Sequence, residues 1–276
     1  MELRVVIAGA AGNMGSQAVR AVSEADDMQL VAAVDPGAID EDAGERAGIG
    51  RIGVPIVGDL ATVFEVANPT VLVDFTRPDT VKQNVLLAVE RGLHAVVGTT
   101  GLSQDDWAEI DQLAREKNVG VLHAPNFALG AVLMMRFARE AARFFPQAEI
   151  IEMHHDHKRD APSGTALHTA EMIRSVWEQA PVPKVDEMEV VEGARGGNAN
   201  GVRIHSVRLP GHVAHQEVLL GLPGETLTIR HDSIDRRCFM PGVLAALRAV
   251  GNLRGVHLGL ENILFSDSNR PIGTRS

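Results

Sequence analysis

Apolar residues follow two different spacings along positions 1–126 of the chain. Short continuous apolar runs are typical of strands buried on both faces, and they occur at 3–8, 30–34, 71–75, 94–97 and 119–122. Between these runs apolar side chains recur at helical spacing, as Met14, Ala18 and Val22 do after the first run. Strands that alternate with helices predict a doubly wound parallel sheet with helices on both faces, an α/β fold.

Local signals place the start of two of these helices. Pro78 is expected at a first helical position, where its missing N–H removes no hydrogen bond. Ser103 and Asp106 have the spacing of an N-cap residue and the partner that bonds back to it. Both helices are therefore expected to begin shortly after a predicted strand has ended.

The pattern changes after Asn126. Helices are expected at 129–145, 165–179 and 239–250, and a loop rich in proline and glycine at 181–201. Strands are expected at 149–153, 202–209, 213–220 and 226–231, the last three antiparallel and joined by turns at Pro210-Gly211 and Pro223-Gly224. We therefore expect two domains. The first covers 1–126 and is completed by 236–276; the second covers 127–235 and is α+β around a mixed, largely antiparallel sheet.

Composition narrows the functional classes. The chain has 276 residues, enough for two domains of ~150 residues each. Its 36 acidic and 26 basic residues give a formal net charge of −10, which disfavours nucleic acid and anionic membranes as partners. Cys238 is the only cysteine, so an intrachain disulfide is impossible. The sequence shows neither a signal-peptide pattern nor an apolar run of the ~18 residues that span a membrane, so we expect a soluble, cytoplasmic protein.

A glycine-rich turn follows the first predicted strand and opens the first helix. It reads Gly9-Ala10-Ala11-Gly12-Asn13-Met14-Gly15, a G-x-x-G-x-x-G variant of the dinucleotide-binding fingerprint. The first glycine permits the tight turn, the second lets the backbone approach a pyrophosphate, and the third lets the helix pack close to the strand. The helix N-terminus would supply N–H groups to the phosphates. By itself such a turn is also compatible with a purely structural strand–helix connection.

Asp35 ends the second strand about 20 residues after the turn, where an acidic side chain bonds a ribose hydroxyl in Rossmann-type domains. It could instead be only a turn residue before Pro36-Gly37. A carboxylate repels a 2′-phosphate, so Asp35 favours NADH, while Arg46 and Arg51 further along could compensate. The expected cofactor is therefore NADH, NADPH or both.

Two later loops are further candidates for cofactor contacts. Gly98-Thr99-Thr100-Gly101 and Ala124-Pro125-Asn126-Phe127 each follow a predicted strand, at the carboxyl edge where such sheets bind ligands. Their small and hydroxyl-bearing residues could line a nicotinamide. Without the glycine-rich turn, we would interpret both segments as ordinary connecting loops with no role in binding.

A cationic strand end runs into a helix start in the second half of the chain. His154, His155, His157 and Lys158 precede Ser163-Gly164-Thr165. A metal site is a poor interpretation, because His154 and His155 point to opposite faces of an extended strand and no matching carboxylate or cysteine pair is present. Backbone N–H groups and hydroxyls at the helix start would instead form an anion cradle, suited to a small carboxylate. A histidine beside it could exchange a proton near neutral pH.

The whole stretch from Glu152 to Ala166 resembles the E-x-H-H-x-x-K-x-D-A-P-S-G-T-A signature of the dihydrodipicolinate reductase family. The glycine-rich turn, Asp74-Phe75-Thr76 and the two later loops also match this family in order. The resemblance therefore covers nearly the whole chain, and the C-terminal half most resembles actinobacterial members. The long signature is specific, whereas the glycine-rich turn is not.

The resemblance implies roles for particular residues. His154 is similar to the family's general acid/base and Lys158 to its second proton donor. Substrate-binding positions correspond to His155, Ser163, Gly164 and Thr165. Cofactor contacts correspond to Gly9, Ala10, Ala11, Gly12, Asn13, Met14, Asp35, Gly98, Thr99, Thr100, Ala124, Pro125, Asn126 and Phe127. Pro36 stands where some members have an arginine, so strong NADP selectivity is not expected.

The resemblance also implies an activity. It is the NAD(P)H-dependent reduction of a cyclic imine dicarboxylate, 4-hydroxy-tetrahydrodipicolinate, to tetrahydrodipicolinate, which belongs to the diaminopimelate route of lysine biosynthesis. The family is typically a homotetramer built through the sheet of the second domain. Two alternatives remain at this point: another two-domain NAD(P)-dependent dehydrogenase of an amino or imino acid, and a non-enzymatic sensor of NAD(H). Neither accounts for the long signature.

Overall fold

The chain forms two compact units in a computed structural model that describes residues 2–178 and 188–265. Unit 1 comprises 1–127 and 239–276, and unit 2 comprises 128–238. The chain therefore leaves the first unit after Phe127 and returns to it at Phe239. The sequence predicts these two boundaries after Asn126 and after Asp235. Among the described residues no helix is long and apolar enough to cross a membrane.

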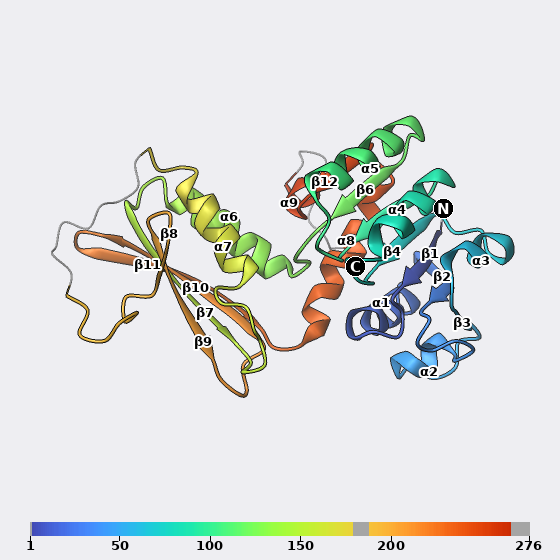
Figure 1. The fold of residues 1–276 in the computed structure, drawn as a ribbon, viewed down its shortest axis with the longest axis horizontal. Helices are drawn as coiled ribbons and strands as arrows, with labels where there is room; N and C mark the ends of the chain where they lie inside the picture. The colour runs from blue at the N-terminus through green and yellow to red at the C-terminus, as the bar shows by residue number, and fades with distance from the viewer. Residues whose placement is uncertain (1, 179–187, 266–276) are drawn as a thin grey trace. The chain divides into compact units, whose positions relative to one another are not determined.

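Unit 1 contains a parallel sheet of seven strands in the order β12-β6-β5-β4-β1-β2-β3 (Figure 1). The strands are β1 (Leu3–Ala8), β2 (Met28–Val34), β3 (Ile56–Val57), β4 (Val71–Asp74), β5 (His94–Val97), β6 (Gly120–His123) and β12 (Gly255–Leu258). The helices are α1 (Asn13–Ser23), α2 (Ala43–Ala47), α3 (Leu60–Val66), α4 (Val81–Glu90), α5 (Gln104–Glu116), α8 (Met240–Val250) and α9 (Glu261–Leu264). Helices α4 and α5 pack together on one face of the sheet and α1 and α8 on the other. The predicted Rossmann-type, doubly wound fold is confirmed.

The core of unit 1 explains why short apolar runs became central strands. Val5, Val6 and Ile7 of β1 are all inaccessible to solvent, because helices cover both faces of the strand. The strand order reverses between β1 and β4: β2 and β3 extend the sheet on one side, and β5, β6 and β12 on the other. The carboxyl edge at this reversal is where open α/β sheets bind ligands.

The two predicted helix starts have different outcomes. Ser103 and Asp106 form a complete capping box at the start of α5, with the Asp106 N–H donating to Ser103 Oγ at 3.1 Å. Pro78 is not at a first helical position, since α4 begins only at Val81. A turn at 77–80 precedes the helix, and the Val81 N–H donates to the Arg77 carbonyl. The proline rigidifies this turn instead of opening the helix.

Unit 2 is α+β around a mixed sheet in the order β11-β10-β7-β9-β8, as predicted. Its elements are α6 (Leu129–Ala141), β7 (Gln147–His154), α7 (Gly164–Arg174), β8 (Gly197–Ala199), β9 (Val202–Arg208), β10 (Ala214–Leu222) and β11 (Glu225–Ser233). A 3₁₀ turn (Arg236–Phe239) leads back to unit 1. Helices α6 and α7 pack on one face of the sheet (Figure 1). Residue 179 of the helix predicted at 165–179, and positions 181–187 of the predicted loop, lie outside the described residues.

One strand pairing differs from the prediction. The strands expected at 202–209 and 213–220 were predicted to be antiparallel partners, but β7 lies between β9 and β10. It pairs with β9 in parallel and with β10 antiparallel, so that Glu152 stands opposite both Ser206 and Gln216. The turn after Leu209 thus crosses over β7 instead of closing a hairpin. This arrangement puts the end of β7, with its histidines, in the middle of the sheet.

Candidate active site

The glycine-rich turn has the backbone shape that the fingerprint predicts. Gly9 has φ 79°, and a Cβ at this position would overlap the carbonyl group of Phe75 after β4. Gly12 is the N-cap of α1 and brings no side chain across the helix start. The backbone at the start of α1 is therefore bare, which suits an approaching phosphate.

Asp35 is tied to this turn through its carboxylate. The Ala11 N–H donates to Asp35 Oδ2 at 3.0 Å, and the Gly37 N–H donates to Asp35 Oδ1 at 2.9 Å. The acid is therefore both a turn residue, as the simpler interpretation has it, and a neighbour of the glycine-rich turn. Each carboxylate oxygen can accept further hydrogen bonds, so a ribose hydroxyl could still be held.

A pocket of about 530 Å³ opens beside these groups, entirely within unit 1. Of the predicted cofactor residues, Gly9, Gly12 and Asp35 line it. Sequence reasoning missed several other residues of its wall, which follow β4 or lie on α4: Phe75, Thr76, Arg77, Thr80 and Asn84. The first two belong to the Asp74-Phe75-Thr76 motif, for which the sequence predicts no role.

The two later loops lie at the same edge of the sheet, after β5 and β6. A Cβ at Gly98 would overlap the ring of Phe75, so the loop after β5 packs directly against the segment after β4. The Phe75 and Phe127 rings also meet edge to face, with centroids 6.0 Å apart. The donor and acceptor groups, the bare helix start and the space all fit a dinucleotide in unit 1.

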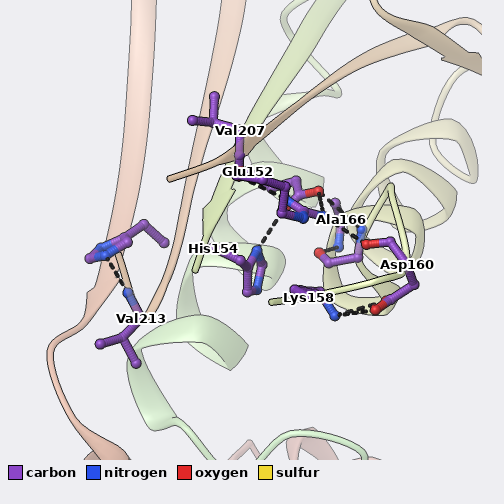
Figure 2. A network of polar contacts seen from close by, with 10 residues as sticks. Glu152, His154, Lys158, Asp160, Ala166, Val207 and Val213 are labelled. Carbon is purple, nitrogen blue, oxygen red and sulfur yellow. Dashed lines mark hydrogen bonds and ion pairs between the residues drawn. The ribbon is translucent and has the colours of Figure 1, made fainter. Parts of the chain in front are cut away.

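The second group of predicted residues lies at the end of β7 in unit 2. His154 Nδ1 is 2.5 Å from Glu152 Oε2, and Figure 2 shows the two side chains pointing toward one another. Glu152 is completely buried, while the His154 side chain keeps 15 % of its surface exposed. The histidine is therefore anchored on one side of its ring and accessible on another.

Arg208 on β9 completes this group. Its guanidinium donates to both carboxylate oxygens of Glu152, at 2.9 and 2.7 Å, and to the Asp160 carbonyl at 2.7 Å. Burial opposes a charge on Glu152, but the hydrogen bonds from His154, Arg208 and Ser206 outweigh it and lower the pKa of Glu152 to about 2. Glu152 is thus a buried carboxylate held ionised by its partners.

The helix start predicted to bind an anion is in place. Ser163 is the N-cap of α7, and its Oγ accepts a hydrogen bond from the Ala166 N–H at 3.2 Å. The Ser163 N–H donates to Glu152 Oε1, so the same carboxylate that holds His154 also fixes the start of α7. No described residue lies within 4 Å of where a Cβ on Gly164 would stand, so the backbone of the first turn is open to a ligand.

Lys158 and His155 lie in the turn between β7 and α7. The Lys158 ammonium donates to both carboxylate oxygens of Asp160, at 2.7 and 2.8 Å (Figure 2). His155 is exposed. The structure thus brings His154, Lys158 and the α7 start together on one connection.

Sequence reasoning missed Glu152 and Arg208 as members of this site. Glu152 is the first residue of the signature, and its alternation with His154 along an extended strand puts both side chains on one face. That spacing could have identified it. Arg208 is 56 positions further along the chain, and only the parallel pairing of β7 with β9 brings it close.

Comparisons with known proteins agree over almost the full length. The model described as "Dihydrodipicolinate reductase, N-terminus" matches residues 3–127, and "Dihydrodipicolinate reductase, C-terminus" matches residues 130–264. The chain belongs to the dihydrodipicolinate reductase family. The curated 4-hydroxy-tetrahydrodipicolinate reductase of Moorella thermoacetica is 50% identical over 262 residues, which are 95% of this chain and 98% of the relative.

Solved structures give the same result. A dipicolinate-bound dihydrodipicolinate reductase from a Paenisporosarcina species is 42% identical, with a TM-score of 0.85 over 95% of this chain and all of the other. An amine dehydrogenase from Mycobacterium smegmatis, 15% identical, has a TM-score of 0.66 over 93% of this chain and 95% of its own, and shows a shared fold alone. The predicted family and enzyme class are confirmed: the chain is an oxidoreductase that uses a nicotinamide cofactor. The finer likeness to actinobacterial members stays a prediction.

Proposed function

We propose that this chain reduces 4-hydroxy-tetrahydrodipicolinate to tetrahydrodipicolinate with NADH or NADPH, as a step of the diaminopimelate route to lysine. The 4-hydroxyl group leaves as water, ring carbon 4 receives the hydride, and a proton completes the product. Its family supports the reaction, and a relative's structure holds dipicolinate, a small cyclic dicarboxylate. The observation that carries the proposal is the buried Glu152 carboxylate, which anchors His154 and the start of α7 at once. A proton donor and an anion-binding helix start are thereby held beside each other.

Hydrogen-bond chemistry decides which atom of His154 exchanges the proton. An ionised Glu152 can only accept, so the hydrogen between it and His154 must sit on Nδ1. The other ring nitrogen, Nε2, is then the atom that gives a proton to the substrate. Nε2 gives that proton from the doubly protonated ring, which Glu152 holds in one orientation.

The substrate carboxylate is proposed to bind at the start of α7. The backbone N–H groups of Gly164 and Thr165 and the positive end of the helix dipole would hold it, with Ser163 fixing the helix start. Lys158 would exchange its present partner Asp160 for the substrate, and exposed His155 would add a further contact. Lys158 can also serve as a second proton donor.

The pocket of unit 1 is proposed to hold the cofactor, which supplies the hydride when bound. Gly9 to Met14 would hold its pyrophosphate, Asp35 a ribose hydroxyl, and Gly98 to Thr100 and Ala124 to Phe127 its nicotinamide half. Pro36 brings no charge beside Asp35 to offset a 2′-phosphate. We therefore expect NADH to bind more tightly than NADPH, with both usable.

A homotetramer in the cytoplasm is the proposed state of the enzyme. Alternation along β7 buries Ala148, Ile150 and Glu152 and leaves Ile151 and Met153 partly exposed on the opposite face. Among the described residues, α6 and α7 pack only on the first of these faces. The opposite face of the mixed sheet is therefore the surface expected to pair with other subunits.

The activity is tested with the unstable substrate generated in the assay mixture itself. Dihydrodipicolinate synthase with pyruvate and aspartate semialdehyde would generate it, and NADH loss would be followed at 340 nm, the usual wavelength for this cofactor. We expect oxidation of NADH only when the synthase and both of its substrates are present. Oxidation with an amino acid or a simple 2-oxo acid instead would indicate a different dehydrogenase.

A further inference from the structure

Asp74 is a completely buried carboxylate for which the proposed mechanism has no use. It is the last residue of β4, opposite Ala8 of β1 and Val97 of β5. It therefore lies where the strand order reverses and where the glycine-rich turn, the segment after β4 and the loop after β5 come together.

Four hydrogen bonds converge on this carboxylate, all within unit 1. Thr76 donates its N–H at 3.0 Å and its hydroxyl at 2.7 Å to Asp74 Oδ1. The Thr99 hydroxyl donates to the same oxygen at 2.7 Å, and Asn84 Nδ2 donates to Oδ2 at 2.9 Å. One side chain thus ties together the segment after β4, the loop after β5 and helix α4.

The direction of these bonds fixes the chemistry of the pocket wall. A carboxylate with four donors around it is acceptor only, so the Thr76 hydroxyl must point its hydrogen at Asp74, and Asn84 must turn its amide N–H toward it. Thr76 and Asn84 also line the pocket proposed for the cofactor. What remains for a ligand is the lone pairs of the Thr76 hydroxyl and, on Asn84, the carbonyl oxygen and the second N–H of the amide.

We propose that Asp74 is a positioning residue for the cofactor: it makes Thr76 and Asn84 present hydrogen-bond acceptors to the pocket, so that the wall takes donor groups such as ribose hydroxyls. The inference rests on the proposed function, in which this pocket holds a dinucleotide. Together with the carboxylate of Asp35, which lines the same pocket, the Thr76 hydroxyl and the Asn84 carbonyl put three acceptor groups on its wall. Charge-assisted hydrogen bonds to Asp74 keep the wall fixed before the ligand arrives.

Two variants separate this role from simple packing. Thr76→Val keeps the shape of the side chain and removes the hydroxyl, whereas Thr76→Ser keeps the hydroxyl and removes a methyl group. We expect the dissociation constant of NADH to rise about tenfold in Thr76→Val, as the loss of one well-placed hydrogen bond implies. Thr76→Ser should stay within about twofold of the wild type, and kcat at saturating NADH should change by less than about twofold in both.

Asp74→Asn tests the buried acid itself. If the oxygen of the introduced amide keeps the bonds from Thr76 and Thr99, its N–H group faces Asn84, which must rotate its own amide and then presents a donor to the pocket. We expect an NADH dissociation constant raised about tenfold at a nearly normal kcat. Circular dichroism and thermal melting would show that the variant is folded at the temperature of the assay.

Binding is measured directly, by calorimetric titration of the full chain with NADH in the absence of substrate. Wild-type binding that weakens in Thr76→Val and Asp74→Asn, and recovers in Thr76→Ser, supports the inference. Unchanged affinity in Thr76→Val or in folded Asp74→Asn, no recovery in Thr76→Ser, or a loss of kcat without a change in affinity would overturn it and leave the proposed function standing. A wild-type chain that does not bind NADH would overturn both.

Discussion

Replacing Glu152 by glutamine removes one negative charge from the group that holds His154. The amide oxygen can still accept from Ser163 and from Arg208 Nη2, but the amide N–H₂ then faces Arg208 Nη1 and His154 Nδ1, both of which are partners of Oε2 in the native chain. To avoid two donors facing each other, the ring must move its hydrogen from Nδ1 to Nε2. In that form Nε2 carries the hydrogen of the ring, and the buried negative charge beside the ring is gone.

The size of the effect follows from the proton-transfer step and from the buried charge. Loss of a well-placed acid/base function costs about 10²–10⁴ in rate, and because His154 itself remains we expect kcat to fall by about 10². The pKa of Glu152 is lowered from 4.5 to about 2 in the folded chain. At 1.36 kcal/mol per unit, this carboxylate stabilises the folded state by ~3 kcal/mol at neutral pH.

Steady-state kinetics and urea unfolding would be measured on Glu152→Gln and on a matched control, Glu149→Gln. Glu149 lies on the same strand and also pairs with a histidine and an arginine, His205 and Arg195, but on the other face of the sheet. We expect a kcat within about twofold of wild type for the control and a loss of stability of less than about 1 kcal/mol, since the Glu149 side chain is one-third exposed. The mass of the assembly formed by Glu149→Gln would also be measured, because this face of the sheet is the proposed contact surface between subunits. Equal kcat in Glu152→Gln and wild type would refute the role of Glu152.

Three further outcomes are expected from the same geometry. His154→Ala should lower kcat by about 10²–10⁴ while the NADH dissociation constant stays the same, as fluorescence titration would show; an unchanged kcat would remove His154 from the mechanism. Lys158→Ala should raise KM for the substrate more than tenfold with a smaller loss of kcat, and a KM equal to wild type would contradict its contact with a carboxylate. The stability contributed by Glu152 is fully present above pH 4.5 and is lost as the pH falls toward about 2, because the folded-state pKa is the lower one. Urea unfolding between pH 6 and pH 3 should therefore show a smaller acid-induced loss in Glu152→Gln than in wild type; parallel curves would count against the buried charge.

Periodicity was sufficient for the architecture of unit 1, because continuous apolar runs are strong signals for strands covered on both faces. It failed where an element is too short to show a period. Strand β3 has two residues and helix α2 five, and neither was predicted. Strand β12 was missed because its four residues include a glycine and a histidine and lie at the edge of the sheet.

Strand order in unit 2 was less accessible to sequence reasoning. The Pro210-Gly211 turn is a sound local signal for a reversal, yet it does not say that β7 occupies the position between the two strands it joins. That order depends on tertiary contacts such as the pair between Arg208 and Glu152. The residues of the signature were predicted from the sequence. Arg208, which supports them, could be identified only from the folded structure.

The most direct test of the proposed function follows the hydride. The chain would be given NADH deuterated at the transferable position of the nicotinamide, with the synthase and its substrates, and the product would be examined by mass spectrometry. The proposed reaction requires tetrahydrodipicolinate that carries one deuterium on ring carbon 4, formed by the wild type and scarcely at all by His154→Ala. NADH consumption without deuterium in this product would contradict it.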